Sequence, residues 1–281
     1  MLTVIVPTYD DWIRLADCIE ALRNQSLDDS EYEILIVNNL PANQPPDSLY
    51  LPRNARILEE SKPGSYAARN LGIQNAAGHI IAFTDSDCIP DRNWLANGLQ
   101  IMATGSNRVA GQIQLKYGSE KLNWAEAHDK AFAFPQRRYA RKGVSTTANL
   151  FVRRKLFDEV GLFDEYLYSG GDIEWNRRAL HRGYSIQYGV ACLVHHPARA
   201  SLSKLFAKRR RVVGGLHAQN GIRALSLLRA MVPPIDRLFQ LSDREITSFQ
   251  ALQAFIIRYL LNLYGVVVTI QLYFGQQAER E

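Results

Sequence analysis

The segment that decides the fold is Ile80-Ile81-Ala82-Phe83-Thr84-Asp85-Ser86-Asp87. Its first four residues form a short apolar run, which is typical of a strand buried on both faces of a parallel sheet. Two aspartates, separated by one serine, follow this strand. A strand of this kind needs helices on both of its faces, so the surrounding sequence should alternate between strands and helices.

The sequence that precedes this segment has the expected alternation. Apolar runs and helical spacing indicate a strand at 2–6, a helix at 12–22, strands at 34–37 and 56–58, and a helix at 65–77. We therefore predict an α/β fold with a doubly wound, mostly parallel sheet and helices on both faces. Ligands of such sheets gather at the carboxyl ends of the strands. Polar segments fall at these ends, at Thr8–Asp10, Asn38-Asn39 and Asp85–Asp87.

Asp85 and Asp87 are candidates for binding a divalent metal ion. Two carboxylates held close together repel each other unless a cation or hydrogen-bond donors lie between them. Mg²⁺ prefers oxygen ligands and commonly takes one or two carboxylates together with substrate phosphates. A polar turn after a strand would use the same residue types. The position of the pair, beside the other polar segments, favours the metal site.

Two later segments also have residues that suit catalysis. The segment Ser169-Gly170-Gly171-Asp172-Ile173-Glu174 opens a predicted helix, and a carboxylate at a helix N-terminus is stabilised in the charged form that a general base requires. An ordinary acidic cap explains it equally well. His195 and His196 end an apolar strand, where imidazole could complete a metal site, although most histidines in such places are packed.

Five segments in one order resemble the motifs of the family-two glycosyltransferases. They are Val4–Tyr9, Lys62–Gly72, Phe83–Asp87, Gly171–Glu174 and His195–Pro197. The resemblance covers residues 1–200, and several spaced motifs are more specific than any single one. It implies the GT-A fold, a nucleotide-diphosphate sugar as donor, a divalent metal ion (Mn²⁺ or Mg²⁺) and inversion at the anomeric carbon.

The resemblance also implies roles for individual residues. The donor would be bound by Pro7, Thr8, Tyr9, Asp10, Asn38, Lys62, Arg69, Asp85, Ser86 and Asp87. Asp87 and His196, or else His195, would bind the metal ion. Asp172 would be the base that deprotonates the acceptor hydroxyl, with Glu174 as the neighbouring acid.

Two positions depart from the pattern of this family. Relatives commonly have an aspartate where this chain has Asn38, which can still form hydrogen bonds to a base or a ribose. Many relatives also have a glutamate before the base, whereas this chain has Gly171. The acidic motif around Asp172 is therefore altered in character.

Two other classes of protein remain as alternatives. A nucleotidyltransferase of sugar metabolism commonly has a glycine-rich phosphate loop after its first strand, and Pro7–Asp10 has no glycine. A non-catalytic protein that binds nucleotides or carbohydrates on the same fold would be expected to lack Asp87 or Asp172. We expect no binding of nucleic acid, because no recognisable module accompanies the basic residues.

Composition and patterning set the domain organisation. The 281 residues are 47% hydrophobic and 22% charged, as in a folded globular protein. We divide the chain into a catalytic domain at 1–200 and a helical, basic and amphipathic region at 201–281. Within the catalytic domain, residues 1–110 would bind the nucleotide sugar and residues 111–200 would bind the acceptor.

The C-terminal region favours contact with a membrane. Basic and apolar residues alternate at Leu202–Arg211, which suits an anionic lipid surface or a phosphate. The stretch Tyr259–Ala278 has no charged residue, but Asn262 and Gln271 favour a helix that is packed or lies in the interface over one that spans. Three cysteines in no paired spacing indicate a reducing compartment.

Together these features predict where the protein works and on what. We expect a cytoplasmic enzyme that is peripherally associated with the inner face of the cell membrane. It would transfer a hexose or N-acetylhexosamine from a UDP-sugar to a saccharide or lipid-linked acceptor in the synthesis of a polysaccharide or glycan.

Overall fold

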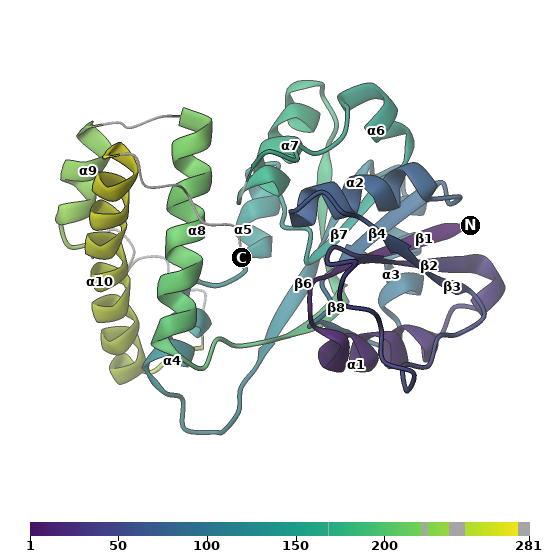
Figure 1. Ribbon diagram of the computed structural model, residues 1–281, viewed down its shortest axis with the longest axis horizontal. Helices are drawn as coiled ribbons and strands as arrows, with labels where there is room; N and C mark the ends of the chain where they lie inside the picture. The colour runs from purple at the N-terminus through teal and green to yellow at the C-terminus, as the bar shows by residue number, and fades with distance from the viewer. Residues whose placement is uncertain (168, 221–223, 236–244, 275–281) are drawn as a thin grey trace. The chain divides into compact units, whose positions relative to one another are not determined.

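The computed structural model describes the chain except residues 168, 221–223, 236–244 and 275–281 (Figure 1). The chain divides into two compact units. The first comprises Met1–Gln114, Phe134–Tyr166 and Gly171–His196, and the second comprises Leu115–Ala133, Leu167–Gly170 and Pro197–Glu281. The division at residue 200 inferred from the sequence stays a prediction.

An eight-stranded sheet has the strand order β3-β2-β1-β4-β7-β6-β8-β5. The strands are β1 (Leu2–Thr8), β2 (Tyr32–Asn38), β3 (Ala55–Glu59), β4 (Ile80–Thr84), β5 (Ile89–Pro90), β6 (Arg108–Lys116), β7 (Asn149–Arg153) and β8 (Ile186–Pro197). Strand β1 pairs in parallel with β2 and β4, and β2 with β3, whereas β7 is antiparallel to β4 and β6, and β5 to β8. The sheet is therefore mixed, and its parallel part is the half that the alternating sequence indicated.

Both faces of β1 are covered by helices, as the apolar strand requires. Val4 belongs to one core cluster with Leu15 and Ile19 of α1 (Trp12–Arg23). Ile5 points to the opposite face, because successive residues of a strand alternate. There α2 (Ser65–Asn75) approaches so closely that a Cβ on Gly72 would lie 2.7 Å from Ile5 Cγ2. The expected α/β fold with helices on both faces is confirmed (Figure 1).

A buried amide joins the antiparallel strands of the sheet. Asn149 Oδ1 accepts a hydrogen bond of 2.9 Å from Trp94 Nε1, and its Nδ2 donates to the carbonyls of Gln112 at 2.8 Å and Cys192 at 2.9 Å. These bonds tie β7 to β6 and β8, and to α3. The other helices of the first unit complete the layers; they are η1 (Asp29–Glu31), α3 (Trp94–Ala103), α5 (Gln136–Arg141), α6 (Lys155–Val160) and α7 (Gly171–His181).

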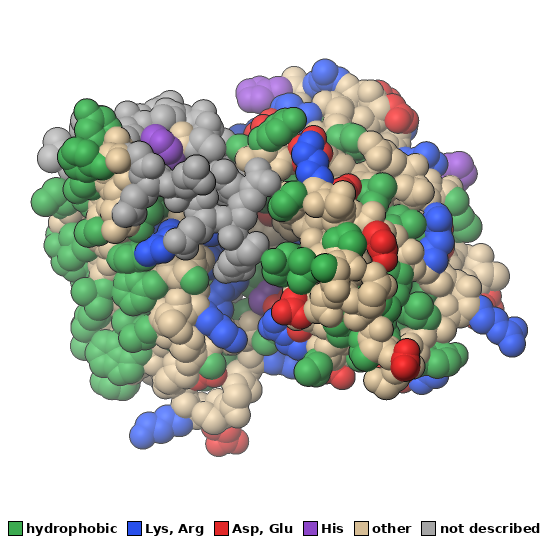
Figure 2. Space-filling model, in the orientation of Figure 1, with side chains coloured by type: hydrophobic (Ala, Val, Ile, Leu, Met, Phe, Trp, Pro, Cys, Tyr) green, Lys and Arg blue, Asp and Glu red, His purple; other side chains and the backbone are tan. Residues whose placement is uncertain are grey.

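The second unit is helical, as the sequence predicted for the C-terminal region. Its helices are α4 (Trp124–Phe132), α8 (Leu202–Asn220), α9 (Ala224–Met231) and α10 (Ser248–Tyr273). Capping boxes begin α4, from Asn123, and α10, from Thr247. Ala125, Leu205 and Ile257 pack α4, α8 and α10 together. Hydrophobic side chains also gather on the exposed surface of α10 (Figure 2).

Candidate active site

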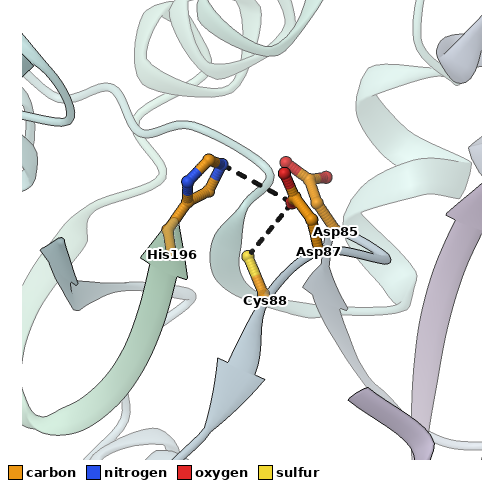
Figure 3. A group of neighbouring side chains, drawn as sticks. All are labelled: Asp85, Asp87, Cys88 and His196. Atoms are coloured by element: carbon orange, nitrogen blue, oxygen red, sulfur yellow. Dashed lines mark hydrogen bonds and ion pairs between the residues drawn. The ribbon is translucent and has the colours of Figure 1, made fainter. Parts of the chain in front are cut away.

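Four side chains with metal-ligating atoms meet at the carboxyl end of β4. They are Asp85, Asp87, Cys88 and His196, and their ligand atoms all lie within 4.8 Å of one another (Figure 3). His196 Nε2 lies 3.5 Å from Asp87 Oδ1, and Cys88 Sγ lies 3.9 Å from the same oxygen. The structure thus joins the end of β4 with the end of β8, more than 100 residues later in the chain.

Strand geometry selects between the two neighbouring histidines. His195 and His196 both belong to β8, so their side chains point to opposite faces of the sheet. His196 is 5% exposed, joins the cluster and lies with its ring 4.5 Å from that of Phe134. His195 is paired with Ile89 of β5, and the cluster of described residues does not include it.

The donor set of this cluster fits a hard divalent cation. Burial raises the pKa of Asp87, an effect that His196 opposes and the nearby Asp85 carboxylate reinforces. Grouping these carboxylates therefore costs free energy, and a bound Mg²⁺ or Mn²⁺ would recover it. Burial also raises the pKa of the Cys88 thiol, so the two carboxylates and the imidazole are the better ligands. Cys88 was not predicted, although it directly follows Asp87.

Arg69 connects helix α2 to the carboxylate pair. Its Nη2 lies 2.5 Å from Asp85 Oδ1, and the arginine side chain is 6% exposed. One turn earlier on the same helix, the ring of Tyr66 lies 5.8 Å from the Arg69 guanidinium carbon. The hydroxyl of Tyr66 lies 3.3 Å from Asp172 Oδ1. These contacts link the carboxylate pair to the residue predicted as the catalytic base.

Asp172 lies in the first turn of α7. Its Oδ1 accepts a hydrogen bond of 2.8 Å from the Ile173 amide, and its Oδ2 accepts one of 3.4 Å from the Thr147 amide. Burial raises the pKa of Asp172, and these amides and Arg69 only partly oppose that effect. A carboxylate with a raised pKa is a stronger base at neutral pH than an ordinary one.

Glu174, predicted as a neighbouring acid, is held by an arginine one turn along α7. Arg178 Nε lies 2.7 Å from Glu174 Oε1, and its Nη2 lies 3.1 Å from Oε2. The same guanidinium donates to the carbonyls of Val160 at 2.8 Å and Leu162 at 2.7 Å. The bidentate ion pair with Glu174 orients Arg178, and the bonds of Arg178 to the two carbonyls fix α7 to the end of α6 and the loop after it.

The predicted nucleotide-binding residue Asn38 shapes the loop that follows β2. It is 1% exposed, its Nδ2 donates to the Asn43 carbonyl at 3.0 Å, and its Oδ1 accepts from the Leu40 amide at 3.0 Å. Asn43 in turn donates to the carboxylate of Asp10, one of the predicted donor-binding residues. The buried side chain of Asn38 thus holds the backbone of the loop in place and is not exposed on the loop's surface.

Asn39 was not predicted, yet it ties two loops of the site together. Its Nδ2 donates to the Lys62 carbonyl at 2.7 Å, and its Oδ1 accepts from the Gly64 amide at 2.8 Å. Gly64 has φ 124°, a conformation that favours glycine, and directly precedes α2. The Lys62 ammonium pairs with Glu165. The one feature of the sequence that could have indicated this contact is that Asn39 directly follows Asn38 at the end of β2.

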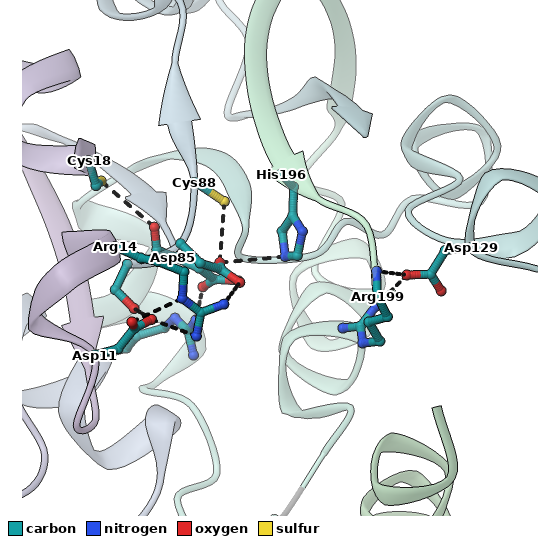
Figure 4. Close-up of polar contacts among 11 residues, drawn as sticks. Asp11, Arg14, Cys18, Asp85, Cys88, Asp129, His196 and Arg199 are labelled. Atoms are coloured by element: carbon teal, nitrogen blue, oxygen red, sulfur yellow. Dashed lines mark hydrogen bonds and ion pairs between the residues drawn. The ribbon is translucent and has the colours of Figure 1, made fainter. Parts of the chain in front are cut away.

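The loop after β1 reaches the carboxylate pair through polar side chains (Figure 4). Ser86 Oγ donates to Asp11 Oδ2 at 3.5 Å, and Arg14 lies 2.8 Å from Asp11 Oδ2 and 3.5 Å from Asp87 Oδ2. Arg14 was also not predicted. Of the predicted residues in this loop, Pro7 and Thr8 are buried in β1, whereas Tyr9 and Asp10 are exposed.

A cavity of about 340 Å³ lies on another face of α2. Ala67, Asn70, Leu71 and Gln74 of α2 line it together with Glu60 and the loop Leu162–Tyr166. None of the residues predicted for the site lines this cavity, so it is separate from the carboxylate cluster.

Sheet topology and the acidic cluster at the ends of the strands define a GT-A enzyme, and comparisons with known proteins identify the family. The Glycosyl transferase family 2 profile matches residues 3–161. Glycosyltransferase AglE of Haloferax volcanii is 34% identical over 221 residues, which are 76% of this chain and 72% of that protein. The chain belongs to glycosyltransferase family 2, and the expected family is confirmed.

Solved structures agree with this fold. S. aureus TarS 1–349 in complex with UDP-GlcNAc superposes with a TM-score of 0.54 at 14% identity, covering 98% of this chain and 92% of that one. The mannosyltransferase PcManGT from Pyrobaculum calidifontis, in complex with GDP-Man and Mn²⁺, has a TM-score of 0.53 at 16% identity, covering 99% and 76%. At these identities the likeness establishes the GT-A fold alone.

The geometry of the cluster predicts which side chains bind the metal ion. Asp87→Asn and His196→Gln should each weaken Mn²⁺ binding at least about tenfold, because each removes a ligand. The electron paramagnetic resonance signal of free Mn²⁺ measures this in a titration without any turnover. His181→Gln, at the exposed C-terminal end of α7, is the matched control. Unchanged affinity in both ligand variants would move the metal site elsewhere.

Proposed function

We propose that this glycosyltransferase inverts the anomeric carbon and uses a divalent metal ion. It transfers a hexose or N-acetylhexosamine from a UDP-sugar to a saccharide or lipid-linked acceptor in the synthesis of a polysaccharide or glycan. One observation carries the proposal: the contacts through Arg69 and Tyr66 connect the Asp85–Asp87 pair with Asp172. A leaving diphosphate and an attacking hydroxyl need these two kinds of group side by side.

The carboxylate pair and its neighbours would hold the donor. Asp87 and His196 would hold a divalent ion, which would neutralise the charge that develops on the diphosphate. Arg69 fixes the carboxylate of Asp85, which would face the ribose or the sugar of the donor. The loops after β1 and β2, which Asn38 and Asn39 brace, would enclose the nucleoside.

Asp172 would act on the acceptor. Its carboxylate takes the proton of the acceptor hydroxyl as the oxygen attacks the anomeric carbon from the face opposite the nucleotide. The new carbon–oxygen bond forms as the bond to the diphosphate breaks, and the nucleoside diphosphate leaves. One displacement inverts the anomeric configuration. Glu174 is occupied by Arg178, so we assign it to holding α7 in place.

Release of nucleoside diphosphate from a panel of sugar donors tests this function. With Mn²⁺ and a set of saccharide and lipid-linked acceptors, one UDP-sugar should exceed all others, including GDP-mannose. Asp172→Asn should lower kcat about a thousandfold while leaving donor binding, measured by calorimetry, nearly unchanged. Glu159→Gln, at an exposed position on α6, is the matched control, and its kcat should stay within about threefold of the wild type. Retained turnover in Asp172→Asn would remove Asp172 as the base.

We also propose that α10 lies in the interface of a membrane. Within the described residues, α10 is the one helix long and apolar enough to cross a bilayer; residues 275–278 of the predicted stretch lie outside those described. One side of α10 packs on α4 and α8 through Ala254, Ile257 and Leu261. The other side exposes Leu252, Leu260, Val267, Ile270 and Tyr273. A helix that is apolar on both sides but packed on one suits the interface better than a span.

The basic residues of α8 divide between packing and attraction to lipid. Arg209 donates to the Leu261 carbonyl at 3.0 Å, and Arg210 donates to the Tyr264 hydroxyl at 3.1 Å. These two side chains hold α8 against α10. Lys204 is exposed, so it is available to an anionic headgroup. Three free, buried cysteines support a reducing compartment, and we place the protein at the cytoplasmic face of the membrane.

Co-sedimentation with lipid vesicles tests the membrane proposal. The protein should bind phosphatidylcholine vesicles containing phosphatidylglycerol, and part of the binding should persist at high salt because apolar side chains contribute to it. Val267→Glu should lower the bound fraction about fivefold. Tyr50→Glu, at an exposed aromatic position in the first unit, should have no effect. Absence of binding to these vesicles would contradict the proposal.

A further inference from the structure

The ring of Tyr66 fills the space beside the proposed base that a side chain at residue 171 would need. The tyrosine is 6% exposed, and a Cβ built on Gly171 would lie 2.7 Å from Tyr66 Cε2 and 2.9 Å from Cζ. Real Cβ atoms do not approach carbon atoms so closely. No side chain fits at residue 171 while the ring of Tyr66 lies there.

The ring of Tyr66 is also held in its orientation by other residues. Its centroid lies 5.8 Å from that of Phe163, and the guanidinium carbon of Arg69 lies 5.8 Å from the ring centroid. The hydroxyl ends 3.3 Å from Asp172 Oδ1. The packed ring therefore holds the phenol hydroxyl where it donates to the Asp172 carboxylate.

The two oxygens of the Asp172 carboxylate differ in their hydrogen bonds. Oδ1 lies 2.8 Å from the Ile173 amide and 3.3 Å from the Tyr66 hydroxyl, so it accepts two hydrogen bonds. Oδ2 has a longer bond of 3.4 Å from the Thr147 amide. The oxygen with the weaker bond is the better proton acceptor, which singles out Oδ2.

We propose that Tyr66 is a positioning residue for catalysis: its hydroxyl donates a hydrogen bond to Oδ1 of Asp172, which leaves Oδ2 to accept the proton of the acceptor hydroxyl. The absence of a side chain at Gly171 makes room for the phenol ring. Tyr66 is thus a neutral, packed partner of the carboxylate. This inference rests on the proposed role of Asp172 as the base.

A hydrogen bond to the charged carboxylate also tunes its ionisation. Donation from a phenol stabilises the charged form and keeps the pKa of Asp172 lower than burial alone would make it. Burial and the Asp172 carboxylate both raise the pKa of Tyr66, so the phenol keeps its proton. Arg69 and Asp85 are the other charged groups that act on Asp172, and Tyr66→Phe leaves both in place.

Tyr66→Phe tests the proposal, because it removes the hydroxyl and keeps the ring. The acid limb of the kcat–pH profile should move up by about one unit, the effect of one hydrogen bond to a charged group. On the acid side of the shifted limb kcat should fall up to about tenfold and recover as the pH rises above it, while KM for the donor stays unchanged. Tyr32→Phe is the matched control, since its hydroxyl donates to the Leu22 carbonyl at 2.7 Å in the core.

A double-mutant cycle separates positioning from packing. Gly171→Ala should displace the ring and lower kcat, and Tyr66→Phe should add little to that loss because the hydrogen bond is already broken. An unchanged kcat–pH profile in Tyr66→Phe, or losses that multiply in the double variant, would overturn the positioning role. Retained turnover in Asp172→Asn would instead overturn the proposed base itself.

Discussion

The site depends on one ion pair, which joins Arg69 of helix α2 to Asp85 at the end of strand β4. A guanidinium that is almost fully buried is costly unless a carboxylate accepts its hydrogen bonds. The pair therefore ties the position of α2 to that of the carboxylates, and it neutralises one of two acidic groups that would otherwise repel. Asp87 is thereby left as the carboxylate that faces His196.

Helix α2 transmits this constraint because its residues three apart lie on the same face. Tyr66 and Arg69 point to the site, whereas Ala67 and Asn70 line a separate cavity. The close approach of α2 to β1 at Gly72 fixes the helix on the sheet. A single helix thus places both the contact to the carboxylate pair and the contact to the proposed base.

Residues next to one another in the chain could be predicted from their pattern, whereas the approach of Asp87 to a histidine of β8 was predicted only through the family resemblance. The aspartate pair after β4 is visible in the sequence because the buried strand and its polar end are contiguous. The choice of His196 over His195 needs the register of β8. Glu174 and Arg178 are spaced for an ion pair on a helix, but only the structure shows that the pair forms. The packing of Arg209 on α10 depends on a helix more than 30 residues later.

Anomalous diffraction from crystals grown with Mn²⁺ and UDP tests the central claim most directly, since it locates the ion and the diphosphate together. The account predicts one strong Mn²⁺ peak within bonding distance of Asp87 and His196, with the diphosphate bound to it and Asp172 facing the opposite side of the sugar position. A peak elsewhere, or a diphosphate bound away from the Asp85–Asp87 pair, would contradict it.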